Sequence, residues 1–162
     1  MSWTFDIDAN QPKADLYADL YRALDGLTAG EPDSIANLAN AAALIWQFLP
    51  DLNWAGFYRL IDGELVLGPF QGKPACIRIA VGSGVCGTAA ATRMVQCVAD
   101  VHSFPGHIAC DADSASELVV PIVVGERLIG VLDLDSPIVG RFDEQDARGC
   151  VRLMELLALR IG

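Results

Sequence analysis

The sequence predicts an α+β domain in which helices pack on a central antiparallel sheet. Apolar residues recur at helical spacing near both ends of the chain, whereas the middle consists of short apolar stretches separated by glycine, proline and aspartate. The expected order is therefore two helices, a run of strands with one short helix among them, and a last helix. Elements grouped in this way favour an antiparallel sheet over an alternating parallel one.

Two helices are expected first. Leucines spaced three and four residues apart indicate an amphipathic helix from 12 to 28, with Pro12 in its first turn and Gly30 marking its end. A segment rich in alanine and leucine indicates a second helix over residues 32–48. Residues 1–11 precede both helices, and we expect them to form a flexible N-terminal extension.

Short strands and tight turns are expected in the middle of the chain. Asp62-Gly63 is typical of a two-residue hairpin turn, and Gly125-Glu126 joins the clearest hairpin. The expected strands span residues 54–60, 64–67, 75–80, 94–98, 118–124 and 127–134.

The remaining segments are a short helix, a loop and a last helix. Residues 82–92 begin with glycines and continue into a run of alanines, which indicates a loop that enters a helix. Residues 101–116 contain Pro105-Gly106 and several small polar residues, so we expect a loop. Asp143 can cap a last helix over residues 144–160, whose apolar side chains form one stripe.

Length, composition and charge limit the possible functions. The chain of 162 residues, 52% of them hydrophobic, fits a single domain over residues 1–162 with a well-packed core. Its formal charge of −10 and its scattered basic residues argue against nucleic acid as a partner, because phosphates need clustered lysine and arginine. No apolar stretch approaches ~20 residues and no signal-peptide pattern is found, so we expect a cytoplasmic protein without a membrane span.

The five cysteines differ in their surroundings. Cys97 and Cys150 lie among apolar residues of a strand and a helix, which favours core packing. Cys76, Cys86 and Cys110 lie at a strand start, at a helix entry and in a polar loop, where a thiol can be exposed and its pKa lowered. An odd number of thiols fits poorly with a purely structural disulfide framework. From spacing alone, reaction and burial are equally compatible with these three cysteines.

A metal site is the competing interpretation. His102, His107 and the same three cysteines include enough ligands for a tetrahedral zinc site. However, the chain has no Cys-x-x-Cys pair and no His-Glu-x-x-His motif, and the spacing of His107 and Cys110 within a loop says little. We therefore expect no metal, and we interpret the two histidines as ordinary hydrogen-bonding loop residues.

Acidic and aromatic residues could build a ligand pocket. Asp133 and Asp135 lie two apart on an expected strand, so both carboxylates point to one face, and Glu117 begins the partner strand. If that face is open, the acids are solvated; if a loop covers it, the three acids would suit an ammonium group, and close approach would raise at least one pKa. Trp54 and Tyr58 share a face of the first strand, where they either pack in the core or wall an apolar or thioether-like ligand.

Five motifs point to one family. They are Asn53-Trp-Ala-Gly-Phe-Tyr58, Leu67-Gly-Pro-Phe-Gln-Gly-Lys73, Gly84-Val-Cys-Gly-Thr88, His107-Ile-Ala-Cys-Asp111 and Gly130-Val-Leu-Asp-Leu-Asp-Ser136. These motifs closely resemble those of the free methionine-(R)-sulfoxide reductases, enzymes that are built on a GAF domain. The resemblance covers residues 16–159, and the contexts of the three cysteines make it far more specific than a GAF-like pattern alone.

The resemblance implies a role for each candidate residue. Cys110 would be the nucleophile that attacks the sulfoxide of free methionine sulfoxide, Cys76 the resolving cysteine, and Cys86 a third thiol whose role varies within the family. The family's pocket carboxylates and aromatic wall correspond to Glu117, Asp133, Asp135, Trp54 and Tyr58. The resemblance also implies L-methionine-(R)-S-oxide as the substrate, thioredoxin as the reductant, no cofactor, and a homodimer formed through the N-terminal helices.

The residues and the resemblance lead to the same chemistry. A thiolate can attack sulfur only if the departing oxygen is protonated, so a neutral carboxylic acid must lie close; we favour Glu117 and Asp135, and the sequence leaves open which of them donates. The reaction would leave a sulfenic acid on Cys110, which Cys76 or Cys86 would convert to a disulfide. The alternative function is a GAF module that senses a small ligand, with redox-sensitive cysteines and no turnover.

Overall fold

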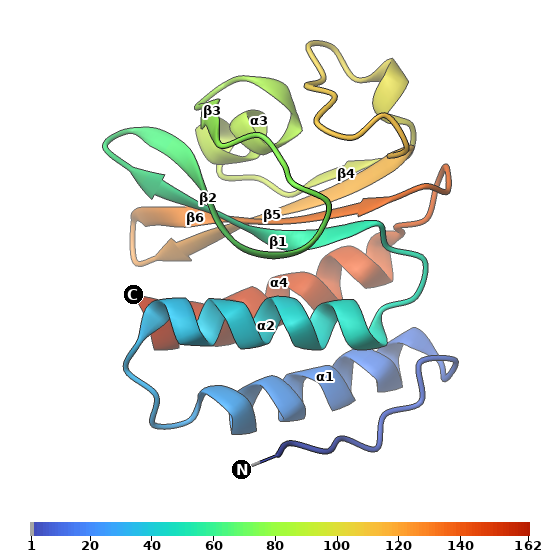
Figure 1. Ribbon diagram of the computed structural model, residues 1–162, viewed down its shortest axis with the longest axis vertical. Helices are drawn as coiled ribbons and strands as arrows, with labels where there is room; N and C mark the ends of the chain where they lie inside the picture. The colour runs from blue at the N-terminus through green and yellow to red at the C-terminus, as the bar shows by residue number, and fades with distance from the viewer. Residues whose placement is uncertain (1) are drawn as a thin grey trace.

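The computed structural model describes residues 2–162, in which helices flank one antiparallel sheet (Figure 1). The N-terminal helices are α1 (Lys13–Thr28) and α2 (Ser34–Phe48), and the last helix is α4 (Glu144–Ile161). The strands are β1 (Trp54–Ile61), β2 (Glu64–Gly72), β3 (Arg78–Ala80), β4 (Gln96–Val98), β5 (Ser116–Val124) and β6 (Arg127–Ser136). A short helix, α3 (Gly84–Thr92), and a 3₁₀ turn at Val101–Ser103 lie between strands. These elements confirm the predicted α+β class.

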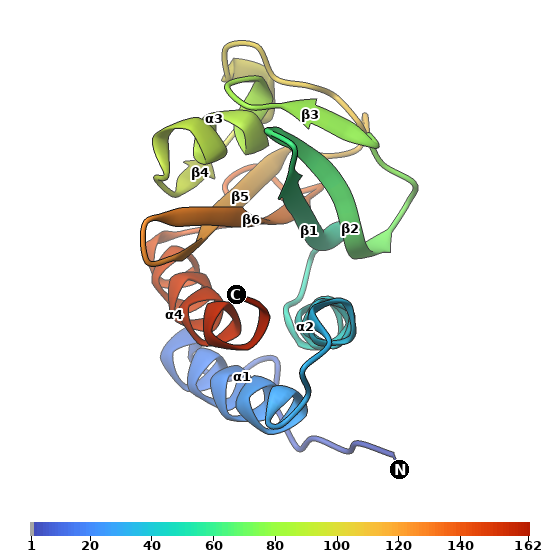
Figure 2. The ribbon, with the colours of Figure 1, turned by 90° about the vertical axis from the view of Figure 1, so that its left-hand side faces the viewer.

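The sheet has the strand order β3-β2-β1-β6-β5-β4, and each neighbouring pair is antiparallel. Helices α1, α2 and α4 lie on one side of the sheet, whereas α3 and the segment after β4 lie on the other, where the edge strand β3 contacts α3 (Figure 2). The predicted turn between β1 and β2 is confirmed, because φ is 51° at Asp62 and 80° at Gly63, as a two-residue turn of type I′ requires.

Alternation along β6 assigns its residues to the two faces. Leu132 and Leu134 are fully buried in the core cluster that the sheet forms with α1, α2 and α4. Asp133 and Asp135 therefore point to the opposite face. Trp54 and Tyr58 of β1 belong to a second, smaller apolar cluster on that opposite face. Burial of the leucines thus fixes the direction in which the aspartates point.

A buried carboxylate joins α1 to α4. Asp146, which is 1% exposed, accepts hydrogen bonds from the Tyr17 hydroxyl at 2.8 Å and from the Lys13 ammonium at 2.7 Å. Asp143 and Asp146 form a capping box at the start of α4, which confirms the predicted cap. The guanidinium of Arg141 lies 3.3 Å from the Asp146 carboxylate, so the buried charge has two cationic partners, as such a charge requires.

Strand β2 is longer than predicted, since it continues to Gly72 although Pro69 lies inside it. β3 pairs with β2 only over residues 64–66, so beyond that point β2 is an edge strand. An edge position tolerates a residue that has no N–H to donate. The Gly-Pro pair therefore does not end the strand.

Strand β3 is shorter than predicted, since it begins at Arg78 rather than at residue 75. The carbonyl of Cys76 accepts a hydrogen bond from the Tyr58 hydroxyl at 2.9 Å, instead of pairing with a neighbouring strand. Cys76 therefore lies in a loop that crosses above β1.

The extension before α1 has neither helix nor strand over residues 2–11. Phe5 and Ile7 are half-buried against the helical side of the core, and the rings of Phe5 and Phe48 meet edge to face at 6.5 Å. Its flexibility stays a prediction. None of the helices within residues 2–162 is long and apolar enough to cross a membrane.

Candidate active site

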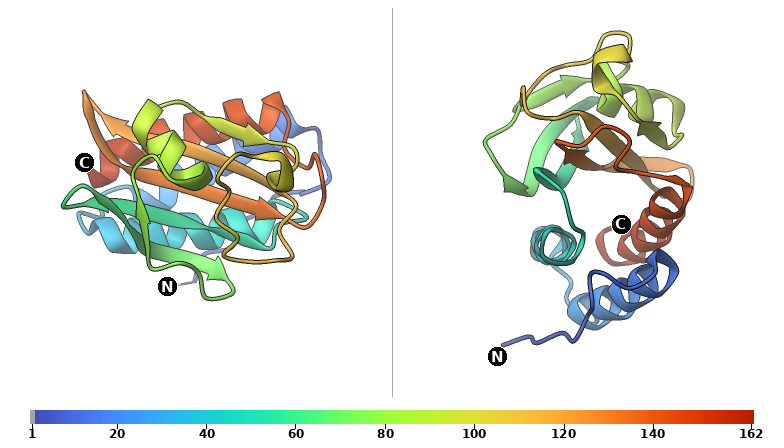
Figure 3. Two further views of the ribbon diagram at one scale, coloured as in Figure 1. Left: turned by 90° about the horizontal axis from the view of Figure 1, so that it is seen from above. Right: turned by 90° about the vertical axis from the view of Figure 1, so that its right-hand side faces the viewer.

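Helix α3 and the loops before β3 and after β4 cover the second face of the sheet (Figure 3). A pocket lies between these segments and the sheet. Its floor comes from β1, β5 and β6, and its walls come from the loop before β3, the start of α3 and the loop after β4. The predicted site residues that line it are Trp54, Tyr58, Cys86, Cys110, Glu117, Asp133 and Asp135. The acids are thus covered by loops and do not form a solvated strand face.

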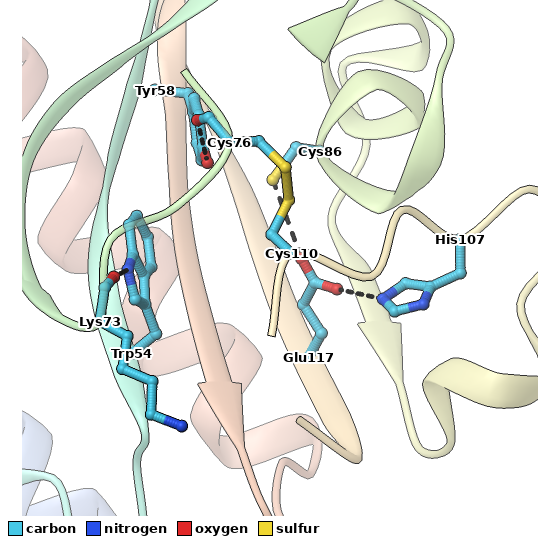
Figure 4. Close-up of a disulfide and its surroundings, with 8 residues drawn as sticks. All are labelled: Trp54, Tyr58, Lys73, Cys76, Cys86, His107, Cys110 and Glu117. Atoms are coloured by element: carbon cyan, nitrogen blue, oxygen red, sulfur yellow. Dashed lines mark hydrogen bonds and ion pairs between the residues drawn. A yellow bond between two sulfur atoms is a disulfide. The ribbon is translucent and has the colours of Figure 1, made fainter. Parts of the chain in front are cut away.

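A disulfide between Cys76 and Cys110 lies at the rim of the pocket (Figure 4). The two Cα atoms are 5.7 Å apart, although 34 positions separate the residues in sequence. Cys110 is exposed and Cys76 is half-buried. Lys73 also joins the two segments, because its ammonium lies 3.6 Å from Asp111 and 2.8 Å from Asp113. This pair of cysteines can therefore change between two thiols and a disulfide at a position that solvent reaches.

Three carboxylates gather on the pocket floor. Glu117 of β5 lies opposite Asp135 of β6, and Asp133 lies on the same face of β6. Burial, followed by the charges of neighbouring acids, raises the pKa of both Glu117 and Asp135 well above their ordinary values, and burial also raises the pKa of Asp133. The floor can therefore keep a carboxylic acid neutral at a pH at which an exposed one is ionised.

One oxygen on this floor has no protein partner. Asp133 is only 6% exposed, and its Oδ1 contacts no hydrogen-bonding atom of the described residues. A buried carboxylate oxygen without a donor is costly. A ligand with a cationic donor, such as an ammonium group, would satisfy it.

Trp54 and Tyr58 form an aromatic wall. Their ring centroids are 5.9 Å apart, and Trp54 also stacks on Phe70 at 5.2 Å. The indole N–H of Trp54 donates to the carbonyl of Lys73 at 3.1 Å, and the Tyr58 hydroxyl donates to the carbonyl of Cys76. Because the polar atoms are satisfied by backbone, the wall offers the apolar surface of its rings to a ligand.

Cys86 lies at the start of α3, with its Sγ 3.8 Å from Oε1 of Glu117. Burial and the surrounding acids raise the pKa of this thiol well above its ordinary value. Of the two alternatives that the sequence leaves open for this thiol, burial is therefore the one that the structure shows for Cys86. The side chain is buried beside carboxylates, which disfavour a thiolate more than the short helix favours it.

The structure also bears on the metal interpretation. Cys86, Glu117 and Asp133 each offer a ligand atom, and these atoms lie within 4.8 Å of one another, so this group could hold a metal ion. The raised pKa of the Cys86 thiol opposes such binding, because metal ligation needs the thiolate. The larger zinc set considered from the sequence also needs Cys76 and Cys110, whose sulfurs are bonded to each other.

The other two cysteines lie outside the pocket. Cys150 is fully buried in α4, which confirms the predicted core packing. Cys97 is exposed, so the same prediction is wrong for it. The reason is that β4 is an edge strand of the sheet and pairs with β5 alone.

His107 is a lining residue to which the sequence assigned only an ordinary loop role. Its Nε2 lies 3.8 Å from Oε2 of Glu117 (Figure 4). The signal that could have indicated it was its position three residues before Cys110, but spacing within a loop does not predict which way a side chain points.

This arrangement can bind and reduce a small sulfur compound. The acids would pair with a cationic group, and the aromatic wall would contact a sulfur-containing side chain. A carboxylic acid that burial keeps neutral can donate a proton to an oxygen leaving sulfur. The adjacent thiol pair can supply two electrons by forming its disulfide.

The chain is similar to a known domain family, to proteins of known activity and to a solved structure. The family model described as GAF domain matches residues 35–161. The chain is 57% identical over 145 residues to free methionine-R-sulfoxide reductase of Escherichia coli (strain K12), with 90% of this chain and 88% of that protein covered. It is 43% identical over 157 residues to free methionine-R-sulfoxide reductase of Saccharomyces cerevisiae, with 92% and 87% covered. The X-ray structure of free methionine-R-sulfoxide reductase from Neisseria meningitidis in complex with its substrate is 42% identical and superposes with a TM-score of 0.93, covering 98% of this chain and 95% of that one.

Proposed function

Because this chain belongs to the GAF domain family and, within it, to the free methionine-R-sulfoxide reductases, we propose that it reduces free L-methionine-(R)-S-oxide to L-methionine. The observation that carries this proposal is the Cys76–Cys110 disulfide at the rim of a pocket floored by carboxylates. The disulfide corresponds to the enzyme after one turnover, before a reductant returns it to two thiols.

The floor and the wall account for a preference for the free amino acid. The ammonium group of the substrate pairs with Asp133 and with whichever of Glu117 and Asp135 does not donate the proton, and Oδ1 of Asp133 gains the donor that it lacks. The sulfoxide side chain lies against Trp54 and Tyr58. A methionine residue inside a polypeptide has no ammonium charge, so it would bury the acids without compensating them.

Cys110 is the nucleophile in this proposal. Its thiolate attacks the sulfoxide sulfur while Glu117 or Asp135 donates a proton to the sulfoxide oxygen. The hydroxyl then passes from the substrate sulfur to the Cys110 sulfur as the bond between the two sulfurs breaks, so methionine leaves and Cys110 carries the oxygen as a sulfenic acid. The Cys76 thiol then attacks the Cys110 sulfur, water leaves, and the disulfide forms. The two electrons gained by methionine come from the two thiols.

Cys76, rather than Cys86, is the resolving cysteine that the geometry favours. The 5.7 Å between the Cα atoms of Cys76 and Cys110 lies within the range of disulfides. Cys86 is buried, and its raised pKa leaves little thiolate to attack a sulfenic acid. Cys86 then contributes to the pocket wall next to Glu117.

Thioredoxin is the proposed reductant. Thiol–disulfide exchange needs direct access to a sulfur, and the exposure of Cys110 supports such access. The proposal also includes action in the cytoplasm and a homodimer formed through the N-terminal helices. A solution mass near the 17.3 kDa of one chain would contradict the dimer.

The decisive experiment is turnover of separated diastereomers. Reduced protein is incubated with dithiothreitol and free methionine-(R)-sulfoxide or its (S) form, and methionine is measured. The (R) form should be consumed and the (S) form left, and Cys110→Ser should abolish turnover. The matched variant Cys97→Ser should keep the parent rate, because Cys97 lies on β4 outside the pocket. Binding of the sulfoxide by the parent without turnover would instead favour the ligand-sensing module.

A further inference from the structure

His107 contacts the proposed proton donor, yet the reaction as written gives it no part. Its side chain is 15% exposed, and its Nε2 faces Oε2 of Glu117 at 3.8 Å (Figure 4). The loop that carries it turns at Gly106, where φ is 73°, and the N–H of His107 donates to the carbonyl of Phe104 at 3.2 Å. The backbone therefore holds this imidazole between solvent and the pocket floor.

The proposed reaction makes Glu117 a group that must be recharged. One sulfoxide and two thiols give one sulfide, one disulfide and one water. Each turnover in which Glu117 protonates the departing oxygen leaves it as a buried carboxylate. The proton of the Cys110 thiol passes to solvent as its thiolate forms, and the proton of the Cys76 thiol leaves with the water, so Glu117 must regain one proton from solvent before the next substrate reacts.

Few groups can deliver this proton. The titratable groups that face Glu117 are Asp133 and Asp135 from β6, Cys86 from α3, Tyr58 from β1 and His107 from the loop after β4. Cys86 and Tyr58 are buried, and burial raises the pKa of both, so neither is an effective donor. Burial also raises the pKa of Asp133 and Asp135, so each of them tends to hold a proton rather than to pass one on to Glu117. His107 is the remaining facing group, and it reaches solvent.

We propose that His107 is the relay through which Glu117 regains its proton from solvent, an inference that rests on the proposed reductase function. The neutral ring takes a proton at Nδ1 from water or a buffer acid as it gives the proton on Nε2 to the Glu117 carboxylate, and proton exchange with solvent then returns the ring to its starting tautomer. Glu117 gains one proton, solvent loses one, and the ring stays neutral. Burial, followed by the charge of His102, lowers the pKa of His107, so the ring is neutral near pH 7 and can both give and take a proton.

The test separates the first turnover from the later ones. Fully reduced His107→Gln and His107→Ala proteins begin with Glu117 protonated, so the first methionine should form at the parent rate. Steady-state kcat with free methionine-(R)-sulfoxide at saturating dithiothreitol should fall about tenfold or more. Added imidazole should restore much of kcat in His107→Ala, because the free ring can carry the proton.

The matched control is Ser103→Ala, since Ser103 is uncharged, is exposed on the 3₁₀ turn of the same loop and does not line the pocket. This variant should keep the parent kcat. An unchanged kcat in both His107 variants would overturn the relay. A first turnover slowed as much as kcat, without a response to imidazole, would also overturn it, because His107 would then act on structure or chemistry. A parent without turnover would contradict the reductase function itself.

Discussion

At the scale of single residues, the pocket depends on burial that shifts acids and bases in opposite directions. The pKa of Glu117 is raised and that of His107 is lowered, in both cases first of all by burial. Burial disfavours whichever form is charged, so the acid keeps its proton and the base loses one. Before a substrate reacts, the pocket therefore holds a neutral acid next to a neutral base.

The proposed role of Glu117 as an acid has a pH signature. In the parent, kcat/KM should fall as pH rises through the raised pKa of Glu117, because the protonated donor is lost. Glu117→Gln should lower kcat/KM by about 10²–10⁴ and remove this alkaline decline, since an amide cannot donate as an acid. Methionine formation between pH 5 and 9 measures both. Glu155→Gln, at an exposed position on α4, should show the parent profile; a decline that persists in Glu117→Gln would assign the donor to Asp135 instead.

The sequence could predict which residues gather, but not how they pair. The strand period of two places Asp133 and Asp135 on one face. The partner of Cys110, in contrast, depends on loops whose course follows from tertiary contacts, such as the hydrogen bond from Tyr58 to the carbonyl of Cys76. The direction of His107 depends on the same kind of loop geometry.

At the scale of elements, the position of Cys86 depends on close contact between α3 and the end of β3. Gly87 lies on α3, and a Cβ added there would be 2.5 Å from the carbonyl oxygen of Ala80. That oxygen belongs to backbone and cannot move aside without shifting the helix or the strand. Glycine at this position therefore allows α3 to seat Cys86 in the pocket wall.

Two glycine-to-alanine variants test this contact. Gly87→Ala should lower the free energy of unfolding by about 1–3 kcal/mol and reduce turnover, since α3 must move away from β3. Gly26→Ala is the matched control, because nothing lies within 4 Å of an added Cβ in α1, and it should stabilise by up to ~1 kcal/mol. Urea unfolding of both measures the difference. Equal midpoints would contradict the role given to Gly87.

Helices and hairpins were predictable because their signals are local. The cap at Asp143 and the turn at Asp62-Gly63 are set by neighbouring residues. The ends of β2 and β3 were not, because Pro69 is tolerated only where a strand lacks a second neighbour, and strand neighbours are a property of the whole sheet.

At the scale of the whole molecule, the redox state of one thiol pair should change global stability. The Cys76–Cys110 bond closes a loop with a sequence separation of 34, for which loss of chain entropy in the unfolded state gives about 4 kcal/mol. Urea unfolding of oxidised protein should therefore need more denaturant than unfolding in dithiothreitol. Cys76→Ser should be indifferent to the reductant. Equal stability of the two parent forms would contradict this prediction, because the disulfide would then not stabilise the fold through the lower entropy of the unfolded chain.

The alternation along β6 also limits how the chain can diverge. Leu132 and Leu134 serve the core, and Asp133 and Asp135 serve the pocket, on one continuous strand. Insertion or deletion of a single codon within this strand would exchange the two sets at once, moving charge into the core and leucine into the pocket. Evolution can therefore change one face of this hairpin by substitution, whereas a change of its length removes folding and catalysis together.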